Sequence, residues 1–204
     1  MKNNLYICSD INSQFANCEL IVKFIVYQKD SITQKMLKQQ DILILLKIVT
    51  YKEAAFAMKD VASALKISPS EVSASLERCK GCGLIDAQKQ KVQKLALQEF
   101  LVHGLKYVYP ASPGSRVRGV PTAHYVSPIK ELIVTNDNDM VVWPYSRGTH
   151  KGFAITPLYR TVPEVVQNDV ELHQLLAIVD CLRMGKRREV ELAKEELKKR
   201  LAYE

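Results

Sequence analysis

Apolar residues recur with helical spacing in the part of the chain that follows Met36. Asp41 is the expected N-cap of a first helix, and apolar positions repeat behind it at i, i+3, i+4 and i+7. These positions are Ile42, Leu45, Leu46 and Val49. A second helix is expected over residues 58–66, where three small or apolar side chains would face inward: Val61, Ala62 and Leu65. The two helices predict an α-helical core at the start of the main body of the chain.

The segment "KISPSEVSASLERC" predicts a third helix and carries a complete start signal. Ser68 is a strong N-cap, Pro69 suits the first helical position, and Glu71 follows three residues after the cap. Behind them, one apolar face repeats at i, i+4 and i+7: Val72, Leu76 and Cys79. Two short helices joined by roughly three residues predict a helix-turn-helix. Lys66 occupies the turn position where glycine is usual, and a left-handed backbone there costs about 1 kcal/mol.

The segment after this helix predicts a β-hairpin wing. Gly83 is expected to end the helix in a left-handed conformation, and "LIDA" is typical of a short strand. "QKQK" predicts a polar turn, and "VQKLA" predicts the returning strand. Three lysines fall here, Lys89, Lys91 and Lys94, where they would suit a wing that contacts phosphates. They would equally suit any solvated loop.

The second half of the chain is predicted to be mainly helical. A long amphipathic helix is expected over residues 95–109 and ends at Pro110. A loop rich in Pro, Gly and Ser follows, then two short strands around a glycine turn within "DMVVWPYSRGTHKGFAITPLY", then two helices within residues 161–204. The predicted fold class is therefore α+β, mainly α, with a winged helix-turn-helix followed by an α-rich C-terminal extension.

Residues 1–35 differ in composition from the rest and predict a separate segment. They are rich in Asn, Ser, Gln and Ile, with one brief apolar run over residues 20–26. One hypothesis is that Met36 is the natural start of the protein. The alternative is an N-terminal arm whose apolar run packs on the body or on a partner. The expected division is an N-terminal extension over 1–35, a DNA-binding domain over 36–94, and a helical extension over 95–204 for dimerisation or for a partner or effector.

Composition and charge narrow the classes of protein. The chain is 47% hydrophobic and 25% charged, as is usual for a globular protein. Its longest aliphatic run, residues 42–46, is far shorter than the roughly 20 residues that cross a bilayer. No secretory leader is evident, so a cytoplasmic location and no membrane partner are expected. A net charge of +7 and a pI near 9.1 favour a polyanionic partner, although such a charge also serves solubility alone.

Cys79 and Cys82 form a Cys-x-x-Cys at the end of the third helix. A structural zinc site would need two further ligands, and His173 and Cys181 lie far away in the sequence. A redox pair usually lies at a helix N-terminus, where the dipole stabilises the thiolate, whereas this pair lies at a C-terminus. We therefore expect core cysteines, no metal and no cofactor. Five cysteines at irregular spacing also do not predict a disulfide framework.

Several sequence blocks occur in a distinctive order: "EFLVHGLKYVYPA", "RGVPTAH", "VWPYSRGTHKGFAITPLY", "TVPEVV" and "LLAIVDCLRMGKRREVELA". With "SPSEVSASL" ahead of them, they resemble a poorly characterised bacterial group of winged-helix proteins, labelled MarR-type or helix-turn-helix transcriptional regulators. The resemblance extends from Met36 to about Leu201. It implies a fold and a regulator role, without a particular ligand or operator. Some members of the group lie beside toxin or host-defence genes, which implies an antitoxin-like autorepressor as a further expectation.

These observations predict a DNA-binding transcriptional regulator, with repression as the expected mode. The third helix would present its first turns to the major groove of double-stranded DNA, with Arg78 at the edge, while Glu71 and Glu77 limit base reading. A homodimer, formed by the terminal helices or by the long helix from Leu95, would add affinity together with lysine contacts to phosphates. The expected DNA contacts are Lys66, Ser70, Ser73, Arg78, Lys89, Lys91 and Lys94, with the loop arginines Arg116 and Arg118 as additional phosphate contacts.

Three other functions compete with DNA regulation. Catalysis is not expected, because the four histidines lie on different predicted elements and neither a phosphate loop nor His-Glu-x-x-His occurs. A protein-interaction module, such as an antitoxin-like partner of a neighbouring gene product, would bind no DNA even at low salt. A ligand-sensing regulator would hold a C-terminal pocket bordered by Tyr125, Tyr159, His124 and Trp143. The candidate effector or partner site comprises Arg118, Thr122, His124 and Trp143.

Overall fold

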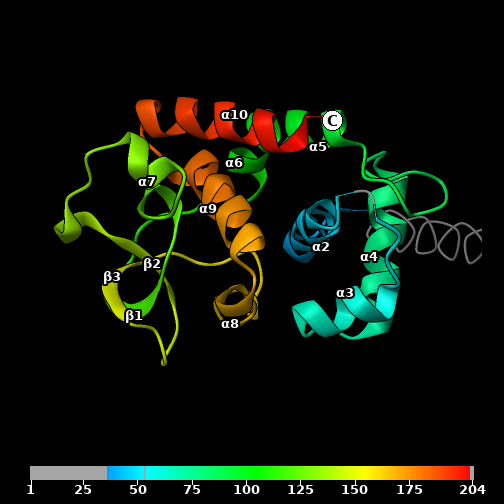
Figure 1. Ribbon diagram of the computed structural model, residues 1–204, viewed down its shortest axis with the longest axis horizontal. Helices are drawn as coiled ribbons and strands as arrows, with labels where there is room; N and C mark the ends of the chain where they lie inside the picture. Colours follow the sequence, from blue (N-terminus) through cyan, green and yellow to red (C-terminus); the bar gives the residue numbers. More distant parts are fainter. Residues whose placement is uncertain (1–35, 53, 203–204) are drawn as a thin grey trace, which may run out of the picture. The chain divides into compact units, whose positions relative to one another are not determined.

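The computed structural model describes residues 36–52 and 54–202, which are mainly helical and include one three-stranded sheet (Figure 1). The predicted α+β class is confirmed at this level. Residues Leu37–Glu204 form one compact unit with a continuous hydrophobic core. The N-terminal extension and its apolar run at residues 20–26 lie outside the described residues. Among the described residues, no helix is long and apolar enough to cross a membrane.

Helix α2 (Gln39–Thr50) is the centre of the core. Residues 42–46 are all fully buried, since α2 packs against α4 on one side and α9 on another, as Figure 1 shows. A helix that is apolar on every side is buried on every side, so the run of five aliphatic residues places α2 inside. The predicted boundary between residues 94 and 95 therefore does not separate two cores, because α2 serves both parts.

Helices α3 (Met58–Leu65) and α4 (Pro69–Gly81) form as the sequence predicts. The hydroxyl of Ser68 accepts a hydrogen bond from the amide of Glu71 at 3.2 Å, and the Glu71 carboxylate accepts one from the Ser68 amide at 3.4 Å. This confirms the predicted capping box. Lys66 ends α3 with φ 54°, so the expected left-handed residue is present at the turn. Val72, Leu76 and Cys79 are buried, which confirms the inner face of α4.

The predicted β-hairpin after α4 is reduced to one bridge between Ile85 and Val92. The Asp86 carboxylate accepts hydrogen bonds from the amides of Gln90 at 2.7 Å and Lys91 at 3.0 Å. These bonds draw the segment into a tight turn, in which Lys89 has φ 58°. The returning strand predicted for "VQKLA" is wrong beyond Val92, because α5 (Lys94–Glu99) begins there.

The long helix predicted over residues 95–109 is confirmed with one irregularity. It consists of α5, a π-helical segment Phe100–Gly104, and α6 (Leu105–Val108). Three leucines on its inner face are fully buried: Leu97, Leu101 and Leu105. By contrast, Val108, near the end of the helix, is 54% exposed. The π-helical segment accommodates one extra residue and rotates the positions after it around the axis.

A small sheet closes on itself and was only partly predicted. Its strands are β1 (Arg116–Pro121), β2 (Val141–Pro144) and β3 (His150–Ala154). β1, which was predicted as loop, pairs antiparallel with both others, while β2 and β3 pair in parallel. The predicted hairpin of β2 and β3 is therefore wrong. Gly119 explains the tight closure, since a Cβ there would lie 2.1 Å from the carbonyl oxygen of Trp143.

The chain ends in helices that cover the sheet and α2. After the short helices α7 (Ile129–Leu132) and α8 (Val162–Val165), α9 (Val170–Met184) and α10 (Arg187–Leu201) pack on each other. The Asp169 carboxylate caps α9 by accepting the Leu172 amide at 3.0 Å. The apolar face of α10 packs within the chain: Ala193, Leu197 and Leu201 are buried, and Val190 is half-buried.

Candidate nucleic-acid interface

The outer face of α4 is open to solvent. Ser70, Glu71, Ala74 and Glu77 are exposed and Ser73 is half-buried, so no other described part of the chain covers this face. The helix is held from behind by α2 and α3, which contact its buried side. A rigid helix with one free face and a capped N-terminus has the form that enters a major groove. Its polar groups are two hydroxyls and two carboxylates, with few donors for reading bases.

Arg78 is not at the edge of this face, and its predicted DNA contact is wrong. Its exposed fraction is 7%, and it donates two hydrogen bonds to Asp41: Nε to Oδ2 at 2.8 Å and Nη2 to Oδ1 at 2.5 Å. These bonds raise the pKa of Arg78 above its usual value. The predicted N-cap role of Asp41 is also wrong. Asp41 lies in the first turn of α2, fully buried, where it accepts the Lys38 amide at 2.8 Å and the Ser75 hydroxyl at 2.5 Å.

Two of the predicted phosphate-binding lysines are paired with carboxylates. Lys66 Nζ lies 2.5 Å from Glu164 Oε1, and Lys89 Nζ pairs with Glu77 Oε1. The hydrogen bond from Lys89 lowers the pKa of Glu77. Exposed ion pairs of this kind contribute between about 0 and 1 kcal/mol, so a phosphate can compete for either lysine. Of the remaining wing lysines, Lys91 is exposed and Lys94 is half-buried.

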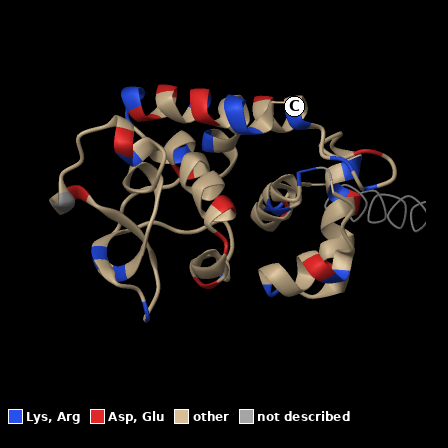
Figure 2. Cartoon of the chain, viewed as in Figure 1, with Lys and Arg blue, Asp and Glu red and all other residues tan. Residues whose placement is uncertain are grey.

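The sheet carries a basic face that the sequence analysis described only as a loop. Residues 100–130 and 140–163 contain no Asp or Glu, and Figure 2 shows Lys and Arg but no acidic residue on β1 and β3. The cations Arg116, Arg118, Arg147 and Lys151 are all exposed. Arg118 lies opposite Lys151 in the β1–β3 register. Like charges directly opposite are destabilising, so this face would be stabilised by a bound anion.

Arg160 is a further exposed cation, near the end of α3, that the sequence analysis missed. Its neighbour Thr161 donates a hydrogen bond from Oγ1 to the carbonyl oxygen of Leu65 at 2.8 Å. This bond places the backbone next to Arg160 beside the end of α3, and the exposed Arg160 side chain lies over the ring of Tyr159. The sequence does show that residues 140–163 contain no Asp or Glu, which indicates a basic segment. It does not indicate which helix this segment contacts.

The residues predicted for an effector site fall into different environments. Thr122 and Trp143 are fully buried, so their predicted place in an open site is wrong. The Asp180 carboxylate binds both, with Thr122 Oγ1 at 2.9 Å and Trp143 Nε1 at 2.7 Å, and it also accepts Arg183 Nη1 at 2.7 Å. Burial raises the pKa of Asp180, and the three donors act in the opposite direction. This network joins β2, α9 and the residue that follows β1 in the core.

The pocket expected in the C-terminal half exists with a changed lining. A cavity of about 440 Å³ includes His124 and Tyr125 but neither Trp143 nor Tyr159. Arg118 is not part of it either, and lies on the basic face of the sheet. Of the four residues predicted for the effector site, only His124 contacts this cavity.

The Cys-x-x-Cys has one buried and one exposed member. Cys79 is fully buried on the inner face of α4, and burial raises the pKa of its thiol to about 12. Cys82 is exposed at the end of the helix, so the core position expected for it is wrong. Within the described residues no group of three or more His, Cys, Asp or Glu side chains could hold a metal ion. The arrangement of Cys79 agrees with a core cysteine.

Comparisons of the chain with known protein families, with curated proteins and with solved structures find no match. Its function must therefore be inferred from its own residues. The strongest grouping of exposed, chemically suitable residues is the outer face of α4 together with the cations around it.

Proposed function

We propose that the protein binds double-stranded DNA through α4, as the recognition helix of a winged helix-turn-helix, and acts as a transcriptional regulator. The observation that carries the proposal is the open outer face of α4, a 13-residue helix fixed from behind by α2 and α3. The buried side of α4 fixes the helix in place, and its exposed polar side is free to contact a partner. Repression is the expected mode, because a protein bound in the major groove of a promoter blocks other proteins from binding there.

Most of the binding energy would come from the phosphate backbone. The α4 face offers Ser70 and Ser73 to the groove, and hydroxyls discriminate weakly between bases. Lys66 and Lys91 lie on the segments that flank α4, Arg160 lies next to Thr161, which bonds the end of α3, and all three would contact phosphates. Such contacts position a protein on the duplex and make its affinity strongly dependent on salt. Specificity would then depend on DNA shape and on paired half-sites.

A homodimer would supply the paired half-sites. The helix from Leu95 is the better interface of the two predicted, because it exposes large apolar side chains, with Leu95 68% and Tyr107 75% exposed. The alternative interface on the last helix is already used, since its apolar face packs within the chain. Two-fold symmetry would place two α4 helices in successive major grooves, about 34 Å apart.

The test is binding to duplexes from the region upstream of the gene, measured by fluorescence anisotropy between about 50 and 200 mM salt. Ala74→Glu places a negative charge on the exposed α4 face and should abolish binding. Ala202→Glu makes the same change at an exposed site at the end of α10 and should leave binding unchanged. Equal binding by both variants, or no binding by the unaltered protein at low salt, would reject the proposal in favour of a protein-interaction module.

A further inference from the structure

A second candidate site is the cavity of about 440 Å³ beside the sheet. It is bounded by β2 and β3, by the segment between α7 and β2, and by the junction of α9 and α10. Its volume lies in the range of small-molecule sites, which are about 300–1,000 Å³. None of its lining residues belongs to the outer face of α4, so the cavity is separate from the proposed DNA contact.

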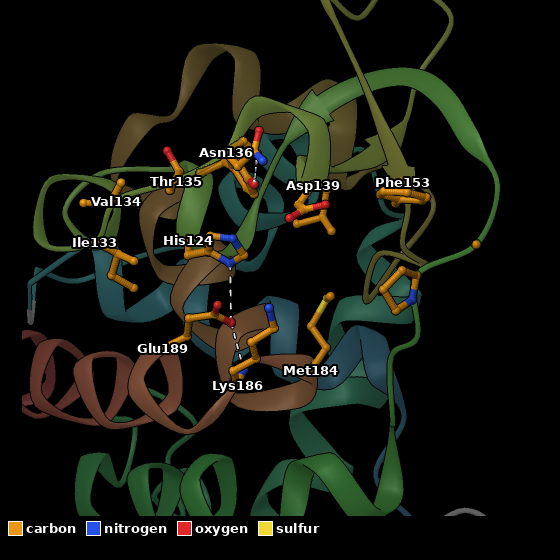
Figure 3. Close-up of a pocket in the computed structure, with 14 residues that line it drawn as sticks. His124, Ile133, Val134, Thr135, Asn136, Asp139, Phe153, Met184, Lys186 and Glu189 are labelled. Carbon is orange, nitrogen blue, oxygen red and sulfur yellow. Dashed lines mark hydrogen bonds and ion pairs between the residues drawn. The ribbon is translucent and has the colours of Figure 1, made fainter.

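The cavity has an apolar surface with two opposite charges across it. Phe153, Val141 and Met184 supply apolar surface. Figure 3 shows Asp139 on one side of the cavity and Lys186 on the other. Neither side chain forms an ion pair within 4 Å with any described residue. Both residues are exposed, so their charges are solvated in the free protein and accessible to a ligand that enters the cavity.

The other charged groups of the cavity are already occupied. Glu189 accepts the amide of Lys186 at 2.8 Å, and its Oε2 lies 3.6 Å from His124 Nδ1. Burial lowers the pKa of His124, which keeps the imidazole neutral at neutral pH, although Glu189 acts in the opposite direction. Because Glu189 already caps the start of α10, that helix end is not an open anion site. Asp139 and Lys186 are therefore the charges that remain for a ligand.

We propose that this cavity binds a zwitterion with an apolar substituent, of the amino-acid class. Its ammonium group would pair with Asp139, its carboxylate with Lys186, and its side chain would contact Phe153 and Met184. A ligand with a single charge would satisfy one of the two residues and leave the other without a partner. A zwitterion satisfies both, and a hydrophobic amino acid also buries apolar surface against the cavity wall.

The test uses three probes of nearly the same shape, measured by calorimetry without DNA. L-phenylalanine carries both charges, N-acetyl-L-phenylalanine lacks the cation, and L-phenylalaninamide lacks the anion. We expect L-phenylalanine to bind and each blocked analogue to bind up to about fivefold more weakly, because each lacks one ion pair with an exposed protein charge. Equal binding of the three probes, or no binding of L-phenylalanine up to millimolar concentrations, would overturn the proposal.

Two variants assign each charge to its residue. In Asp139→Asn the disadvantage of N-acetyl-L-phenylalanine should disappear while that of the amide remains, and in Lys186→Gln the pattern should reverse. Glu195→Gln and Lys198→Gln make the same changes at exposed sites outside the cavity and should keep the original preference. A uniform loss of all three probes in either cavity variant would contradict the assignment. Since no DNA is present, failure of the DNA proposal leaves this result intact.

Discussion

Arg78 of α4 and Asp41 of α2 form a buried bidentate ion pair, with Nε to Oδ2 at 2.8 Å and Nη2 to Oδ1 at 2.5 Å. The same carboxylate accepts the Ser75 hydroxyl, also from α4. One acidic residue at the start of α2 therefore binds two side chains of α4 and fixes its orientation. A residue that the sequence suggests for DNA contact instead holds α4 in place.

Arg78→Ala should lower the free energy of unfolding by about 3–5 kcal/mol, since it leaves the buried Asp41 carboxylate without its cation. Urea denaturation measures the change. Lys80→Ala removes an exposed cation from the same helix and should change the free energy of unfolding by no more than about 0.5 kcal/mol. If Arg78→Ala kept full stability but lost DNA binding, Arg78 would be a contact residue after all.

The wing lysines should contribute mainly electrostatic affinity. The double replacement Lys89→Ala and Lys91→Ala should weaken binding to all duplexes and reduce the salt slope by roughly one to two phosphate contacts. Loss of Lys89 also leaves Glu77 unpaired on the α4 face, which adds repulsion. Anisotropy titrations at several salt concentrations give the slope, and an unchanged slope would exclude the wing from the interface.

Removing cations from the basic face of the sheet should affect the stability of the free protein and its affinity for DNA differently. Arg116→Ala with Arg118→Ala removes the like-charge contact with Lys151, so the free protein should keep its stability or gain slightly. DNA affinity should fall, with a reduced salt slope, if this face contacts the duplex. Lys198→Ala with Lys199→Ala removes two cations from α10 as the matched control. Identical salt slopes for the two double variants would remove the sheet from the interface.

The helices could be predicted from the sequence because their signals are local. The Ser68 to Glu71 capping box and the i, i+4, i+7 repeat of α4 depend on neighbouring residues only, and both were predicted correctly. The left-handed backbone of Lys66 was also predictable, because it depends only on the short turn between two adjacent helices. What a local pattern cannot specify is the partner of a side chain distant in sequence, such as Arg78 with Asp41.

The sheet could not be predicted because its determinants are pairings between distant segments. β1 contains a glycine and a proline, which argue against a strand, yet Gly119 allows β2 to approach closely. Trp143 and Thr122 suggested a ligand site by residue type. They are instead the donors that a buried carboxylate on α9 requires, and Asp180 lies 37 residues or more from either in the chain.

His173 should make stability depend on pH. Burial lowers its pKa below 6.5, while its hydrogen bond to the Pro121 carbonyl oxygen at 2.8 Å acts in the opposite direction. Because the unfolded chain binds the proton more readily, the contribution of His173 is fully present above the unfolded pKa and is lost as pH falls below it. The free energy of unfolding should therefore decrease between about pH 7.5 and 5.5.

His173→Gln keeps a donor for Pro121 but no longer titrates, so the decrease in stability with falling pH should become smaller. His124 contributes with the same sign, because burial also lowers its pKa, and some pH dependence should remain. His150→Gln replaces an exposed histidine and serves as the control. Urea denaturation across the pH range would contradict this account if His173→Gln and the control gave the same profile.

Gly119→Ala should destabilise the protein by about 3 kcal/mol, because the sheet closes with no room for a side chain there. The added Cβ would lie 2.1 Å from the Trp143 carbonyl oxygen and 2.9 Å from Val142 Cγ2. Since Trp143 is the only tryptophan and donates a hydrogen bond to Asp180, its fluorescence reports displacement of this strand.

Gly81→Ala is the matched control. The added Cβ meets no atom within 4 Å, so the substitution should be neutral or stabilising at the end of α4. Equal melting temperatures for the two variants would contradict this prediction, because they would show that β1 and β2 accommodate the added Cβ without loss of stability.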